Sequence, residues 1–245
     1  GPSVAMYNQC AKVEGMHIIE PAYTQESGYP LVQVLAAITD NTRVVVVSNP
    51  NNPCGTITSN ESIRAISQAA PQAAILVDEC YFEYSKHTVV SELSHLPNVF
   101  VTRTFSKTWG IPSLRFGYLM ASAENILALC NVRGPYDNNQ LAVVAVNAAL
   151  DHPEYTTNYV QEVMSQSKPL LESWLTKNGI EYWCSQVNYI WCFPDKVKYV
   201  GEDLQEHGVL LRPKAYRDQL GLRITVGTVE QMTLLMDEWD RFLLL

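Results

Sequence analysis

The chain has 245 residues, 47% of them apolar and 17% charged, enough for one large globular domain or two smaller ones with hydrophobic cores. Its formal net charge is -8, and its sequence has no cluster of lysine or arginine. Both observations argue against a nucleic-acid partner or an anionic membrane surface. Its apolar runs are too short to cross a bilayer, and its first residues do not resemble a signal peptide, so we expect a soluble, cytoplasmic protein.

Strand-like and helix-like segments alternate in the first half of the chain. The predicted strands are 17–20, 43–49, 73–79, 98–104 and 114–121. The predicted helices are 4–14, 30–38 and 59–70. The continuous β-branched run at 43–49 is typical of a strand buried on both faces. This alternation predicts an α/β fold, with a mostly parallel central sheet and helices on both of its faces.

Helices dominate after residue 121. The predicted helices here are 123–132, 138–151, 154–177, 196–207 and 229–243. Short strands are predicted at 180–184, 188–193 and 222–226. Because a long helix often connects two domains, we predict a large domain over 1–160 and a smaller C-terminal α/β domain over 161–245.

The six cysteines include no Cys-x-x-Cys pair, and the five histidines show no ligand spacing with them. Neither a metal site nor a disulfide framework is therefore expected.

Polar residues follow two of the predicted strands. In NPNNPCG (49–55), the prolines and glycine predict a turn of fixed geometry. This turn is either only a sharp loop or a support that aims the amide of Asn52 at a ligand, with a cis bond before Pro53 setting the angle. Asp78 ends the next strand, where a carboxylate needs a cation or strong donor, or caps a helix.

Lys107 follows the third strand in RTFSKTWGIPSLR (103–115). It is either a solvated surface lysine or a nucleophile toward carbonyl groups. Ser106 and Arg115 offer a hydroxyl and a guanidinium, which are groups that hold a phosphate. A lysine beside a phosphate pocket suggests a phosphorylated carbonyl cofactor.

Two arginines, Arg212 and Arg223, adjoin strand-like runs near the end of the chain. If they converge, they form a site for a carboxylate or phosphate; if they diverge, they are ordinary surface charges. Their spacing leaves both alternatives open.

Five segments, in this order, resemble the pyridoxal-phosphate-dependent aminotransferases of fold type I, with the greatest similarity to histidinol-phosphate aminotransferases. They are SNPNNPCG, VDECYFEYS, TRTFSKTWGIPSLRFGY, VNYIWCF and GLRITVGT, spread over residues 48–228. The resemblance implies an enzyme that transfers an amino group between an amino-acid or phosphorylated amine donor and a 2-oxo acid. It also implies a homodimer.

For the cofactor ring, the resemblance implies a role for four residues. Lys107 would form the Schiff base and carry the proton between the substrate α-carbon and the cofactor. Asp78 would pair with the ring nitrogen. Asn52 and Tyr81 would hydrogen-bond the phenolic oxygen.

For the charged ends of cofactor and substrate, the resemblance implies further contacts. Ser106 and Arg115 would hold the cofactor phosphate. Asn188 would lie near the substrate. Arg223, together with Arg212, would bind the substrate's anionic group.

The sequence also departs from the family pattern. Val4 stands where the family has an aromatic residue that stacks on the ring, and Cys54 stands where threonine is usual. Family members have a further N-terminal part before this point, so we expect the large domain to be incomplete. Two alternatives therefore stay open: a decarboxylase of a phosphorylated amino acid, and a catalytically weak or inactive fragment that acts as a binding domain.

Overall fold

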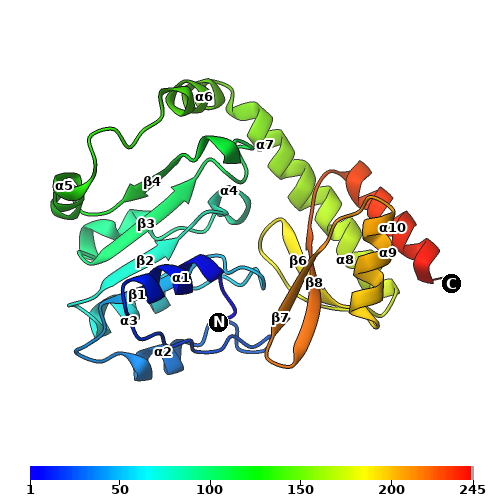
Figure 1. Ribbon diagram of the computed structural model, residues 1–245, viewed down its shortest axis with the longest axis horizontal. Helices are drawn as coiled ribbons and strands as arrows, with labels where there is room; N and C mark the ends of the chain where they lie inside the picture. Colours follow the sequence, from blue (N-terminus) through cyan, green and yellow to red (C-terminus); the bar gives the residue numbers. More distant parts are fainter. Residues whose placement is uncertain (244–245) are drawn as a thin grey trace.

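The structure, a computed structural model, describes residues 1–243. It contains two four-stranded sheets that lie beside one another (Figure 1). A long helical segment passes from the first sheet to the second, and in this view the N-terminus lies between the two sheets (Figure 1).

The first sheet is mostly parallel. Its strands, in spatial order, are β1 (Val44–Ser48), β2 (Ala74–Asp78), β3 (Val99–Thr104) and β4 (Gly117–Met120). The first three strands are parallel, and β4 is antiparallel to β3. The α/β prediction is thereby confirmed in its coarse form, since each of these strands falls within a predicted one.

One face of this sheet forms a hydrophobic core with α2 (Leu31–Ala37) and α3 (Asn60–Ala69). The side chain of Ser59 caps α3 by accepting a hydrogen bond from the backbone N–H of Ser62, as its position before an amphipathic run predicts. The prediction that strand 43–49 is buried on both faces is wrong. Val44 and Val46 are exposed, because alternate side chains of β1 point away from the face that α2 and α3 cover.

Helices connect the two sheets. They are α5 (Ala123–Val132), α6 (Gln140–Asp151), α7 (Pro153–Glu162) and α8 (Lys168–Lys177), whereas the short helix α4 (Phe82–Ser85) lies between β2 and β3 of the first sheet. A π-helical turn, Val163–Ser167, joins α7 to α8, so the predicted long helix is one continuous segment with a local widening. It ends at Asn178 and Gly179, as expected.

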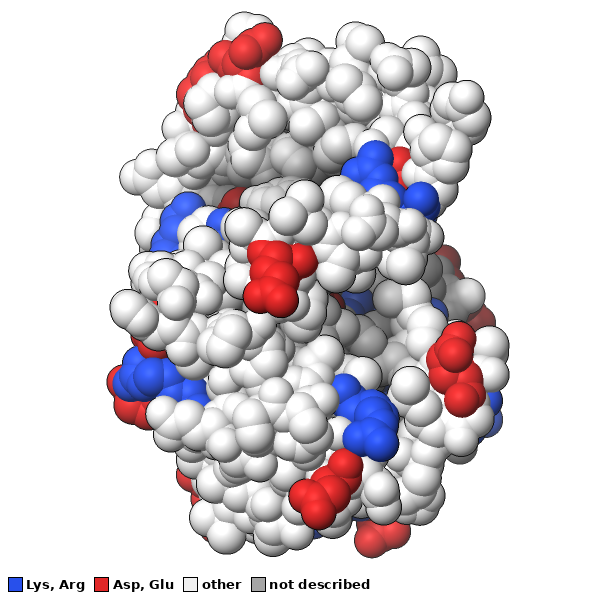
Figure 2. All heavy atoms as spheres, turned by 90° about the vertical axis from the view of Figure 1, so that its left-hand side faces the viewer, with Lys and Arg blue, Asp and Glu red and all other residues white. Residues whose placement is uncertain are grey.

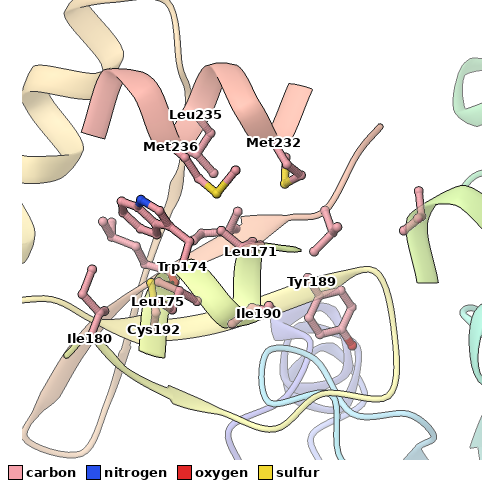
Figure 3. Close-up of a cluster of buried hydrophobic side chains, with 14 of the residues drawn as sticks. Leu171, Trp174, Leu175, Ile180, Tyr189, Ile190, Cys192, Met232, Leu235 and Met236 are labelled. Atoms are coloured by element: carbon pink, nitrogen blue, oxygen red, sulfur yellow. Dashed lines mark hydrogen bonds between the residues drawn. The ribbon is translucent and has the colours of Figure 1, made fainter. Parts of the chain in front are cut away.

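The second sheet is entirely antiparallel. Its order is β5 (Glu181–Trp183), β6 (Tyr189–Phe193), β8 (Gln219–Thr225) and β7 (Arg212–Tyr216). Figure 3 shows its core, in which α8 and α10 (Val229–Leu243) pack on β6. Trp174, Met236 and Ile190 are central contacts, and α9 (Val197–Glu206) contributes Val200 and Leu204.

Two sequence predictions need correction. Residues 17–20 form no strand, because most of them are exposed and none pairs with another strand. Strand β7 was not predicted, since it gains its hydrogen bonds from β8 and carries mostly exposed residues. The division at residue 160 falls within α7 and stays a prediction. Leu244 and Leu245, at the end of the predicted second domain, lie outside the described residues.

The surface seen in Figure 2 carries charged side chains as separate groups, and its upper part is largely uncharged. Exposed apolar residues gather on α5, α6 and the segment between them: Leu127, Val132, Tyr136, Leu141 and Val144. Among residues 1–243, no helix is both long and apolar enough to pass through a bilayer.

Candidate active site

The loop 49–55 is fixed in place by both parts of the chain. Asn49 binds the backbone of Thr58 through both ends of its amide, at 3.0 Å and 2.9 Å. Gly55 has a φ of +69°, and a side chain there would meet Ser185. The bond between Asn52 and Pro53 is cis. The loop therefore holds Asn52 at the junction of the two sheets.

Asp78 ends β2 and accepts hydrogen bonds only from neutral donors in the described residues. Its Oδ1 accepts from the backbone N–H of Cys80 at 3.1 Å and from the hydroxyl of Thr102 at 3.4 Å, and its Oδ2 accepts from the Tyr7 hydroxyl. Burial, and then the nearby Asp78 carboxylate, raise the pKa of Tyr7. The sequence alone does not predict the contact between Tyr7 and Asp78, because a contact over 71 residues leaves no local signal.

The fully buried carboxylate is the next residue, Glu79, rather than Asp78. Its Oε2 lies 2.8 Å from Nη2 of Arg103, and its Oε1 accepts from the Val89 N–H at 2.9 Å. The guanidinium of Arg103 also lies 3.5 Å from the centroid of the Phe82 ring. The sequence alone does not predict this ion pair, although Glu79 directly follows β2 and Arg103 lies in the neighbouring strand β3.

Lys107 is exposed, in the turn that follows β3. Its Nζ lies 5.8 Å from the ring centroid of Tyr81. Tyr81 is buried and meets Tyr189 edge-on, with 5.0 Å between the ring centroids. Burial raises the pKa of Tyr81 to about 12, so its hydroxyl stays protonated at neutral pH.

A cavity of about 370 Å³ brings several predicted residues together. Ser106, Lys107 and Tyr81 line it from the first part of the chain, and Asn188 and Arg223 line it from the second. Asn188 Oδ1 and Arg223 Nε are buried and have no hydrogen-bond partner within residues 1–243. Since buried polar atoms normally have partners, these two atoms are suited to a polar ligand.

Arg212 and Arg223 lie directly opposite each other on β7 and β8. Both arginines line a second cavity of about 410 Å³. Arg223 and Thr225 line both this cavity and the first one. Burial, followed by the charges of Arg223 and Arg212, lowers the pKa of Lys214. The two arginines therefore converge on one cavity, and their binding of an anion stays a prediction.

Arg115 lies outside the residues that line either cavity. It is exposed, and its Nη1 donates to the carbonyl of Pro112 at 2.9 Å. Its contact with a phosphate stays a prediction. Asn52 and Asp78 also do not line the first cavity. Asn52 is connected to it through Arg223, a lining residue whose Nη1 donates a hydrogen bond of 3.0 Å to Asn52 Oδ1.

The fold and the sequence together define the class of this protein: it is homologous to pyridoxal-phosphate-dependent aminotransferases. More particularly, the chain belongs to the aminotransferase class I and II family, whose sequence pattern matches residues 1–238. Histidinol-phosphate aminotransferase 2 of Hydrogenovibrio crunogenus is 35% identical to it over 234 residues. That match covers 91% of this chain but only 61% of the relative, so this chain spans less than two thirds of the relative's length.

Solved structures share the fold. Histidinol-phosphate aminotransferase from Sinorhizobium meliloti, in complex with pyridoxal-5'-phosphate, aligns with a TM-score of 0.85 and 24% identity, over 98% of this chain and 69% of that one. L-threonine-O-3-phosphate decarboxylase from Porphyromonas gingivalis aligns with a TM-score of 0.82 and 21% identity, over 100% and 75%. The family uses pyridoxal phosphate as its cofactor.

Proposed function

We propose that this chain is the cofactor-binding and substrate-binding part of a histidinol-phosphate aminotransferase-like enzyme. Its reaction would transfer an amino group between an amino-acid or phosphorylated amine donor and a 2-oxo acid. The observation that carries the proposal is the cavity where Lys107 and Tyr81 face Asn188 and Arg223, with two buried polar atoms that have no partner in the described part of the chain. The residues present fit pyridoxal phosphate, which offers a carbonyl, a phenolic oxygen, a ring nitrogen and a phosphate.

When bound, pyridoxal phosphate supplies a carbonyl carbon for covalent attachment of amines and a ring that accepts electrons from the substrate α-carbon. Lys107 Nζ would hold the cofactor and then move the proton to and from that carbon. Asp78 would keep the ring nitrogen protonated, since its carboxylate has only neutral donors in the described residues. Asn52 and Tyr81 would bind the phenolic oxygen.

The charged ends need separate contacts. Ser106, in the cavity, and Arg115, after a rotation of its exposed side chain, would bind the cofactor phosphate. Asn188 would contact the substrate. Arg212 and Arg223 would bind the substrate's carboxylate or phosphate, as their convergence on one cavity supports.

Titration with pyridoxal phosphate tests this proposal. The visible absorption band of a Schiff base should appear, borohydride should abolish the band, and mass spectrometry should then place the cofactor on Lys107. Lys107→Ala should give no such band, while Lys177→Ala, which removes an exposed lysine at the end of α8, should behave as the unmodified chain. Absence of the band from the unmodified chain contradicts the proposal.

A second candidate reaction is decarboxylation of a phosphorylated amino acid, because a solved decarboxylase shares this fold. The two reactions differ in the bond that is broken at the substrate α-carbon. Amino transfer from a panel of donors to 2-oxoglutarate supports the aminotransferase. Release of carbon dioxide without any 2-oxo acid supports the decarboxylase.

The homodimer is also part of the proposal. The apolar side chains exposed on α5 and α6, among them Leu127, Leu141 and Val144, support a protein interface there. Light scattering should give twice the mass of one chain. A single-chain mass over a wide concentration range contradicts this part of the proposal.

A further inference from the structure

The turn that carries Lys107 is held from both sides. On its N-terminal side, Phe105 is buried against the rings of Trp109 and Phe116, with centroid distances of 5.4 Å and 5.8 Å. Within the turn, the N–H of Gly110 donates to the carbonyl of Lys107 at 3.0 Å. Lys107 itself is exposed, so the neighbouring contacts decide where its amine lies.

On the C-terminal side, one carboxylate holds the next two residues. The hydroxyl of Thr108 donates to Glu83 Oε2 at 3.1 Å, and Nε1 of Trp109 donates to Glu83 Oε1 at 3.0 Å. Thr108 is buried and Trp109 half-buried, so these contacts are sheltered from water. Hydrogen bonds to a charged acceptor are the stronger kind, and here both oxygens of one group are used.

Glu83 also has a fixed relation to the rest of the site. It lies in α4, five residues after Asp78 and two residues after Tyr81. The same short segment therefore carries the carboxylate assigned to the ring nitrogen, the tyrosine below Lys107, and the anchor of the Lys107 turn. Displacing the turn from Glu83 would separate Lys107 Nζ from the Tyr81 ring.

We infer that Glu83 is a positioning residue for Lys107: by binding Thr108 and Trp109, it holds the turn so that the amine stays at the cavity. This inference rests on the proposed function, since it gives Lys107 its role there. Glu83 itself is not among the residues that line the cavity. Its effect on the reaction passes through Lys107.

Two measurements on folded variants test the inference. Without cofactor, hydrogen exchange of the amides at 105–111 should be about tenfold faster in Glu83→Ala than in the unmodified chain, the order expected when hydrogen bonds to a charged group are lost. With pyridoxal phosphate, borohydride trapping on Lys107 should slow by about the same factor. Glu83→Gln should restore most of both values, because its uncharged amide can still accept from Trp109 and donate to Thr108.

Glu92→Ala is the matched control. It removes a carboxylate that accepts two side-chain hydrogen bonds, from Asn60 and Arg64, away from the Lys107 turn. This variant should exchange and trap as the unmodified chain does. If Glu83→Ala does not fold, Trp109→Phe, which keeps an aromatic ring but removes the pyrrole part of the indole with its N–H, should show the same changes in weaker form.

The inference is overturned if folded Glu83→Ala shows unmodified exchange at 105–111 and unmodified trapping. It is also overturned if Glu83→Gln behaves as Glu83→Ala. If the unmodified chain traps no cofactor at Lys107, the proposed function fails instead, and the exchange measurement alone then decides whether Glu83 holds the turn.

Discussion

Arg223 Nη1 donates a hydrogen bond of 3.0 Å to Asn52 Oδ1 across 171 residues of sequence. The contact joins β8 of the second sheet to the loop that follows β1 of the first. Two hydrogen bonds to backbone carbonyls reinforce the junction, since the Tyr189 hydroxyl donates to the Asn51 carbonyl at 2.8 Å and the Gln186 N–H donates to the Gly55 carbonyl at 3.0 Å. A direct hydrogen bond thus links Asn52, which is proposed to bind the cofactor, to Arg223, which is proposed to bind the substrate.

Arg223→Lys should weaken anion binding by about tenfold, because lysine cannot donate from a planar fork to Asn52 and to an anion together. Calorimetric titration with inorganic phosphate measures the affinity. Arg133→Lys, an exposed substitution on another part of the surface, is the control and should change nothing. An unchanged phosphate affinity in Arg223→Lys excludes an anion site at Arg223.

Tyr7→Phe should weaken pyridoxal phosphate binding several-fold and lower the free energy of unfolding by about 1 kcal/mol, because Asp78 loses one hydrogen-bond donor. Cofactor titration and urea unfolding measure the two effects. Tyr199→Phe removes an exposed hydroxyl and should have neither effect. Equal affinities in the Tyr7 variant and the unmodified chain show that the contact does not support Asp78.

Alkaline pH should destabilise the protein through Tyr81. Its folded pKa of about 12 exceeds the ordinary value of 10.0, so its contribution is complete below pH 10 and is lost as the pH rises toward 12. This difference in pKa corresponds to a loss of about 3 kcal/mol in the free energy of unfolding at high pH. Urea unfolding between pH 9 and 12 should show a smaller loss in Tyr81→Phe than in the unmodified chain, and parallel curves for the two contradict the assignment.

Glu79→Gln should lower the free energy of unfolding by about 3 kcal/mol or more, because it leaves the charge of Arg103 largely buried without its partner. Glu154→Gln is a matched substitution in an exposed pair with His152 and should cost less than about 1 kcal/mol. Urea unfolding compares the two. Similar small costs in both variants show that the Glu79–Arg103 pair contributes little.

Patterns within a few residues led to correct predictions in most of the fold. Ser59 begins α3 where its side chain can bind a free backbone N–H, and Gly179 ends α8 with a positive φ. The apolar runs of β2 and β3 likewise give strands at the expected positions. These features depend on local hydrogen bonds and side-chain periodicity, which any short stretch of sequence carries.

Contacts between distant residues account for the errors. Strand β7 forms because β8 pairs with it. Strand β1 has an exposed face because α2 and α3 cover only its other face. The sequence singled out Asp78 as the buried acid, yet Glu79 is the one with no exposed surface, since the two side chains leave the strand on opposite faces.

The sequence alone determined which residue types end each strand, and thereby nominated Lys107, Asp78 and Asn52. Only the tertiary structure decided that Arg212 and Arg223 converge and that Tyr7 reaches Asp78. The reason is physical: a side chain's chemistry and its local backbone are encoded within a turn or strand, whereas its partners are set by how separate elements pack.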